Sequence, residues 1–292
     1  MLALKEVIDV EKRVLGRTGC ELSVVGFGGI LVMNESPAES QRLVARAIDA
    51  GINYFDVAPS YGNAEERLGP ALEPYRQNVF LACKTAKRDA AGARDELEAS
   101  LEKMRTDYFD LYQLHAVTTR EDVETIMGPD GALETFLEAR EEGLVRFLGF
   151  SAHSEEAAIA LLNQFPFDSI LFPLNWVTWN EGGFGPKTVE TAQAKGAGRL
   201  ALKALAKRKW ANDDERKAWP KSWYRPVETL DEARLALRFT LSLPVTAAVT
   251  PGHAQFLDWA IEIAQDLTPL TPEEQQLVAE NAKGLAYIFP QN

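Results

Sequence analysis

The stretch YFDVAPSYG, residues 54–62, begins with a short apolar run (54–58) and continues into a polar loop. Runs of the same kind return along the chain, separated by segments in which apolar residues are spaced as in helices. Short apolar runs of this length predict buried strands. We therefore expect strands at 24–29, 54–58, 79–84, 110–115, 147–152, 169–175, 198–205 and 246–250.

The segments between these runs predict amphipathic helices. One is expected from about Pro37 to Ala50, with Ser36, Pro37 and Glu39 forming a capping-box start. Two others carry apolar residues three and four positions apart, which is the spacing of one helix face. These residues are Leu97, Leu101 and Met104 in the first, and Leu230, Ala233, Leu237 and Leu241 in the second.

Strands that alternate with helices predict βαβ units and a parallel sheet. Eight such units favour an α/β fold of the (β/α)8 TIM-barrel type, with a doubly wound open sheet as the second choice. Residues 13–22 predict a short N-terminal hairpin cap, and residues 272–287 predict one extra C-terminal helix. With no linker or repeat in between, we expect residues 1–292 to form a single domain.

Composition narrows the range of functions. The formal net charge of −12 argues against binding to nucleic acid or to an anionic membrane, because both need a basic face. Charged residues interrupt the first dozen positions, and no apolar run approaches a membrane span, so we expect neither a leader nor an anchor. Only two cysteines occur, far apart, which predicts a reduced, cytoplasmic protein without a metal site.

Polar residues gather where the predicted strands end. Asp56 lies near the end of the second strand, Lys84 ends the third and His115 ends the fourth, while Tyr61 follows in the loop after the second. The carboxyl ends of barrel strands share one face, so these four side chains are expected to meet. Any one of them alone could be an ordinary solvated strand end, but four together predict a site.

The four side chains form a chemically sensible set for proton transfer. A tyrosine with a pKa of about 10 is a weak acid at neutral pH, and a neighbouring ammonium lowers that pKa. Lys84 would do so, Asp56 would balance its charge, and His115 would orient a substrate oxygen. Such a site can protonate a carbonyl oxygen while hydride arrives from elsewhere, which implies a nicotinamide cofactor.

Six motifs occur in order along the chain: GFGG (26–29), GINYFDVAPSYGNAEERLG (51–69), ACKT (82–85), DYFDLYQLH (107–115), EEGLVRFLGFS (141–151) and VTPG (249–252). Together they resemble the aldo-keto reductases, over roughly residues 13–270. The resemblance implies Tyr61 as general acid, Lys84 and Asp56 as the pair that tunes its pKa, and His115 as the orienting histidine. It also implies a small carbonyl substrate, the barrel fold and NADP(H), with NAD(H) as the alternative cofactor.

The cofactor pocket departs from the family's usual residues. Ala152 stands where an Asn is common, Leu171 where a Gln is common, and Leu202 where an aromatic often stacks on the nicotinamide. No basic clamp follows residue 252, so cofactor phosphates would depend on Lys203 and on residues 207–225, which could equally be a solvated loop. The expected cofactor-binding residues are Gly29, Ile30, Asp56, Ser151, Ala152, Lys203, Leu205, Gly252 and His253.

Two other functions fit the same chain. The altered cofactor contacts would suit a redox-sensing or regulatory barrel with little turnover. A Schiff-base lyase would use Lys84 or Lys203 as its nucleophile. An ion pair with Asp56 would keep the amine of Lys84 protonated, which weighs against Lys84 in that role.

Overall fold

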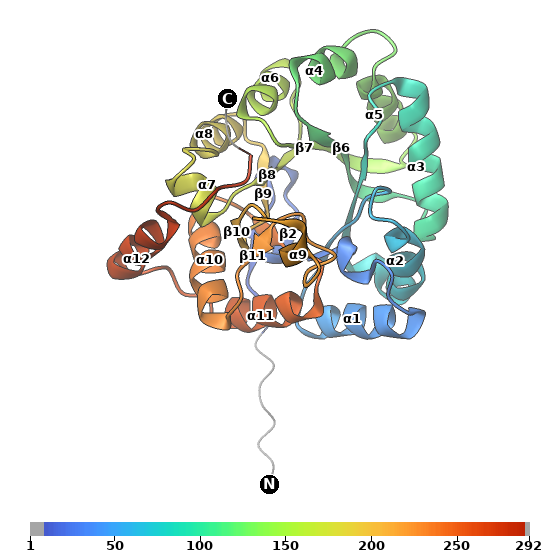
Figure 1. Ribbon diagram of the computed structural model, residues 1–292. Helices are drawn as coiled ribbons and strands as arrows, with labels where there is room; N and C mark the ends of the chain where they lie inside the picture. The colour runs from blue at the N-terminus through green and yellow to red at the C-terminus, as the bar shows by residue number, and fades with distance from the viewer. Residues whose placement is uncertain (1–8, 290–292) are drawn as a thin grey trace.

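The computed structural model describes residues 9–289, and it contains a closed barrel of eight parallel strands. The eight predicted strands are all present, in the barrel order β12-β3-β4-β5-β6-β7-β8-β9. Figure 1 shows the helices arranged around them. The strands are β3 (Val25–Gly28), β4 (Tyr54–Asp56), β5 (Phe80–Thr85), β6 (Phe109–Val117), β7 (Val145–Ala152), β8 (Ser169–Pro173), β9 (Gly198–Leu202) and β12 (Ala247–Val249).

Helices follow the strands and cover the barrel from outside, as expected for a (β/α)8 fold. They are α1 (Pro37–Asp49), α2 (Ala64–Leu72), α3 (Ala90–Met104), α4 (Arg120–Met127), α5 (Ala132–Glu141), α6 (Glu155–Gln164), α7 (Trp176–Asn180), α8 (Pro186–Ala194), α9 (Asp213–Arg216), α10 (Leu230–Ser242), α11 (Ala254–Gln265) and α12 (Pro272–Ala282). Short 3-10 turns span Gly16–Thr18, Gly29–Val32 and Glu73–Asn78.

Two antiparallel hairpins accompany the barrel. The predicted cap is the first of them, β1 (Lys12–Val14) paired with β2 (Glu21–Ser23). Its residues Leu15 and Leu22 are fully buried and pack in one cluster with inward-facing strand residues such as Tyr54 and Leu111. The hairpin therefore closes one end of the barrel interior.

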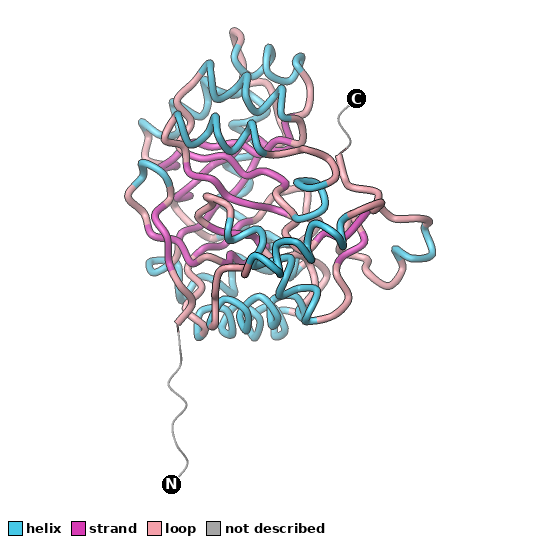
Figure 2. Tube along the Cα trace, turned by 90° about the vertical axis from the view of Figure 1, so that its left-hand side faces the viewer, coloured by secondary structure: helices cyan, strands magenta, loops and turns pink. Residues whose placement is uncertain are grey.

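The second hairpin pairs β10 (Ala206–Arg208) with β11 (Arg225–Pro226), and α9 lies between them. Figure 2 shows this segment projecting from one end of the barrel, beyond the ring of helices. It comprises most of the basic segment 207–225, so that segment is a folded projection rather than an irregular loop.

Two boundaries and one helix cap differ from the sequence-based expectation. The seventh barrel strand ends at Leu202 instead of residue 205, because Lys203 adopts a positive φ of 63° that a strand cannot continue through. The last helix ends at Ala282, two residues before Gly284, which has a φ of 73°. At α1, Ser36 accepts a hydrogen bond from the Glu39 backbone N–H, but the Glu39 carboxylate bonds Arg42, so the capping box is half formed.

Other expectations for the chain have different outcomes. The prediction about the first dozen residues falls largely on residues 1–8, which lie outside the described residues. Between residues 9 and 289, no helix combines the length and the apolar character needed to cross a membrane.

Candidate active site

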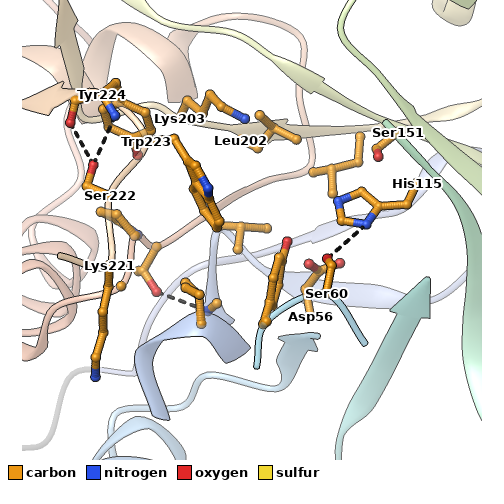
Figure 3. Close-up of a pocket in the computed structure, with 18 of the residues that line it drawn as sticks. Asp56, Ser60, His115, Ser151, Leu202, Lys203, Lys221, Ser222, Trp223 and Tyr224 are labelled. Carbon is orange, nitrogen blue, oxygen red and sulfur yellow. Dashed lines mark hydrogen bonds between the residues drawn. The ribbon is translucent and has the colours of Figure 1, made fainter. Parts of the chain in front are cut away.

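The four predicted catalytic side chains lie around one cavity at the carboxyl ends of the barrel strands. Figure 3 shows Asp56 and His115 in this cavity. Asp56 is the last residue of β4, Lys84 lies near the end of β5 and His115 near the end of β6, while Tyr61 lies in the loop before α2. The register pairs Asp56 with Ala82, so Lys84 comes two residues further along the neighbouring strand and faces the same side. Strand register thus brings distant residues together.

Lys84 and Asp56 form a buried ion pair. The Lys84 ammonium also donates to the carbonyl of Val57 at 3.3 Å. The second oxygen of Asp56 accepts from the Gln113 amide at 3.0 Å and from the Tyr54 hydroxyl at 3.3 Å. Burial lowers the pKa of Lys84, but the charge and hydrogen bond of Asp56 together with the neighbouring Tyr61 and Cys83 outweigh burial, and the pKa is raised overall. Lys84 is therefore a fixed positive charge at neutral pH.

Tyr61 lies against that charge. Its ring centroid is 5.4 Å from the Lys84 ammonium nitrogen, and its ring meets that of His115 edge-on, with the centroids 5.9 Å apart. Burial raises the pKa of Tyr61, and the ammonium of Lys84 lowers it by less, so the net shift is upward. The net fall expected from the sequence is therefore wrong. The sign differs because burial desolvates the phenol and the charge of Asp56 adds to the rise in pKa.

His115 has neighbours in hydrogen-bond range at its backbone and at its ring. Its backbone carbonyl accepts a hydrogen bond from Arg88 at 2.9 Å, and its Nδ1 lies 3.4 Å from the Ser60 hydroxyl. Burial and the charges of Lys84, Lys203 and Arg88 lower the pKa of His115 to about 3. The imidazole is therefore neutral at pH 7, and Nε2 is the nitrogen left to meet a substrate oxygen.

We expect neither His115 nor His153 to gain a proton between pH 8 and pH 5. Burial is the first cause for both, and it lowers the pKa of His153 to about 2. The chain has three histidines, so imidazole NMR signals can be assigned with single His→Gln variants. An ordinary titration midpoint near pH 6.5 for His115 would contradict this expectation.

The same shifts link pH to stability. The unfolded chain binds protons at these histidines below about pH 6.5, whereas the folded chain does not until its lower pKa is reached. The unfolded state thus holds more protons in the interval, and the free energy of unfolding falls as the pH drops from about 6.5 toward 3. Denaturant titrations at pH 7 and pH 5 measure this loss.

The cavity has a volume of about 400 Å³. Of the predicted cofactor residues, Ile30, Asp56, Ser151, Lys203 and Gly252 line it. The Ser151 hydroxyl accepts from the Ala116 backbone N–H at 2.8 Å, which leaves its own hydrogen for a partner. Leu171 and Leu202, noted as departures from the family, also lie in the wall.

Four predicted cofactor residues do not line the cavity. Ala152 and Leu205 are buried in the outer apolar core, and a Cβ on Gly29 would meet Val57 at 2.8 Å. His253 lies beside Gly252, and its ring packs against Trp219 with the centroids 5.2 Å apart. The Nε2 of His253 is buried and has no hydrogen-bond partner within residues 9–289.

Sequence reasoning missed an aromatic side of the cavity. Trp223 and Tyr224 come from the segment after β9, and Phe289 comes from beyond α12. Trp223 lies 5.9 Å from Tyr61 between ring centroids and is 54% exposed. The sequence does contain a signal for this wall, the adjacent aromatic residues Trp223 and Tyr224. They lie in the basic segment 207–225, whose charge suggests phosphate binding rather than a cavity wall.

The basic segment 207–225 is largely neutralised within the protein. Five of its seven Lys and Arg side chains form ion pairs with carboxylates. The pairs are Lys207–Glu232, Arg208–Glu215, Lys217–Asp214, Lys221–Glu35 and Arg225–Glu228. This arrangement favours a solvated projection over a dedicated phosphate clamp.

Known proteins resemble this chain in sequence. The chain is 32% identical over 157 residues to the uncharacterized oxidoreductase YqkF of Bacillus subtilis (strain 168), covering 49% of each chain. It is 33% identical over 177 residues to the aldo-keto reductase YhdN of the same organism, covering 54% of this chain and 52% of YhdN. The chain thus spans about half the length of the curated relatives it matches.

Structural comparison extends over nearly the whole chain. The holo form of aldo-keto reductase AKR11C1 from Bacillus halodurans superposes with a TM-score of 0.73 at 26% identity. That match covers 95% of this chain and 98% of the other. The family model for the Aldo/keto reductase family matches residues 24–255, which include all four cavity residues Asp56, Tyr61, Lys84 and His115. The chain therefore belongs to the aldo/keto reductase family.

Proposed function

We propose that this protein is an NAD(P)H-dependent oxidoreductase of the cytoplasm that reduces an aldehyde or ketone to an alcohol. The convergence of Tyr61, His115 and the Lys84–Asp56 pair on one cavity supports this function. A bound nicotinamide cofactor supplies hydride, a reaction that no side chain can perform. The test is oxidation of NADPH and NADH, followed spectroscopically, with a panel of small aldehydes and ketones.

In the proposed reaction, the substrate oxygen lies between Tyr61 and His115. The neutral imidazole of His115 donates a hydrogen bond and orients the carbonyl. As negative charge develops on the oxygen, the phenol of Tyr61 gives up its proton. The Lys84 ammonium stabilises the phenolate, and Asp56 keeps that lysine protonated. Because its pKa is raised, the phenol of Tyr61 is protonated at neutral pH and can donate its proton when negative charge develops on the substrate oxygen.

The cavity also offers groups that suit a nicotinamide nucleotide. The Ser151 hydroxyl retains a free hydrogen, and helix α11 begins beside Gly252 with no side-chain cap on its first turn. Uncapped backbone N–H groups at a helix start favour phosphate. The unpartnered Nε2 of His253 at the same turn adds a polar group without an assigned role. We propose that these residues, with Ile30 and Lys203, hold the cofactor.

We expect NADPH to bind more tightly than NADH by less than about a hundredfold, or about 2.7 kcal/mol. NADP(H) is the family's usual cofactor, but the cations of residues 207–225 are mostly committed to carboxylates. Partly exposed cations that are already paired with carboxylates distinguish NADPH from NADH less well than an arginine fitted to the 2′-phosphate. Fluorescence titrations with both cofactors in the same buffer measure the ratio, and a ratio well above a hundredfold would show a dedicated 2′-phosphate site.

A further inference from the structure

Lys203 is a second lysine of the active-site cavity, and its backbone sets it apart. It follows β9 directly, and its φ of 63° lies in the left-handed region that side chains other than glycine seldom adopt. Lys203 lines the same cavity as Tyr61 and His115. In Figure 3 its amine end lies beside Leu202, in the pocket wall.

The surroundings of the Lys203 amine are unusual for a lysine. Its nitrogen lies 3.3 Å from Nε2 of His153 and 5.1 Å from the ring centroid of Phe289. No carboxylate in residues 9–289 forms an ion pair with it. Lys84, in contrast, is paired with Asp56 and bonded to the carbonyl of Val57. Three lysines line the cavity: Lys84 pairs with Asp56 and Lys221 pairs with Glu35, whereas Lys203 has no carboxylate partner within the described residues.

Electrostatics point in the same direction. Burial and then the charge of Lys84 lower the pKa of Lys203 to about 7. The imidazoles of His153 and His115 also face it, and both are neutral at pH 7. Tyr224, whose pKa is raised by burial, and Lys209 line a second cavity together with Lys203. About half of Lys203 is then free amine at pH 7, against about 0.04% of an ordinary lysine with a pKa of about 10.4. An imidazole without a proton on Nε2 can accept a hydrogen bond from that amine.

We propose that Lys203 is a nucleophilic amine that forms an imine with aldehydes entering the cavity. The nitrogen lone pair attacks the carbonyl carbon, a C–N bond forms, and the carbonyl oxygen takes a proton to become a hydroxyl. The nitrogen loses its remaining protons as the hydroxyl, protonated by solvent, leaves as water and a C=N bond forms. No electrons are exchanged with a third partner, so imine formation needs no cofactor. Lys203 is also one of the residues proposed to hold the cofactor, so the two roles compete for one side chain, and the test below is made without cofactor.

The cavity walls define the class of aldehyde. The amine lies beside Leu202 and Phe289, with Trp223 on the same cavity, so the carbon chain of the aldehyde meets apolar surface. A small apolar aldehyde fits better than a sugar or a charged one. Because Tyr61 and Lys203 share the cavity, captured aldehyde would occupy the space in which carbonyl reduction is proposed.

The test is reductive trapping of the full-length protein without cofactor. Pentanal and sodium cyanoborohydride are added at pH 7, and peptide mass mapping locates the secondary amine that results. We expect Lys203 to be alkylated before every other lysine, at a rate that rises with pH around a midpoint near 7. The chain's α-amino group, with an ordinary pKa of about 8, reacts in the same sample and serves as an internal reference.

Two variants complete the experiment. Lys203→Arg keeps a positive charge but cannot form an imine. We therefore expect no alkylation at position 203 in this variant. Lys283→Arg alters an exposed lysine that pairs with Glu280, and the label on Lys203 should be unchanged. Should wild-type Lys203 react no faster than the surface lysines, or only at the high pH of an ordinary lysine, the proposal is wrong. This comparison is made within the wild-type protein, so it holds whether or not the variants fold.

Discussion

Tyr61→Phe is expected to reduce carbonyl turnover by about 10²- to 10⁴-fold, the usual contribution of a general acid. The phenylalanine ring would keep the contacts with His115 and Trp223, so the cavity should retain its shape. The proton donor alone would be lost. Turnover is measured with saturating cofactor and the best aldehyde of the panel.

Cofactor affinity separates this explanation from a damaged pocket. The Tyr61→Phe variant should bind NADPH within about a factor of two or three of wild type. Trp223→Ala is a useful comparison, because it removes a partly exposed ring from the same cavity without touching a proton donor. If Tyr61→Phe retained more than about a tenth of wild-type turnover, Tyr61 would not be the general acid.

Lys84→Met is expected to be as damaging as the tyrosine change. The ammonium is the group that lowers the pKa of Tyr61 against the effect of burial, so without it the phenolate loses its stabilising charge. Asp56 would also be left buried with only Gln113 and Tyr54 as partners, which adds a cost in folding free energy. Unfolding by denaturant must therefore be measured beside turnover.

The double variant distinguishes a coupled pair from two independent contributors. If Lys84 acts through Tyr61, then adding Lys84→Met to Tyr61→Phe removes little further turnover. A double loss equal to the product of the two single losses would mean that Lys84 contributes separately. The comparison needs the same substrate, pH and saturating cofactor for all four proteins.

The barrel and the meeting of the four polar side chains were predictable because both depend on local pattern. Each barrel strand is a short apolar run, and Asp56, Lys84 and His115 come at or near the ends of three of them. Once the strands are parallel, topology places those ends on one face. Even the partner of Lys84 follows from register, since Asp56 and Lys84 lie two positions apart on adjacent strands.

The remaining features depend on contacts between residues far apart in the sequence. The positive φ of Lys203, which shortens β9, is rare for lysine and carries no sequence signal. Phe289 reaches the cavity from beyond the last helix, and Trp223 reaches it from a projecting hairpin. The sign of the Tyr61 pKa shift depends on how far the folded chain buries the phenol. Each of these features follows from how residues far apart in the sequence pack around the cavity.

The position of Phe289 has a practical consequence for handling the protein. A peptide joined after Asn292 begins only a few residues beyond a side chain that forms part of the cavity wall and contacts Lys203 and His153. Displacement of Phe289 by such a peptide would open the cavity wall beside Lys203. Activity is therefore best compared between preparations with and without the added peptide.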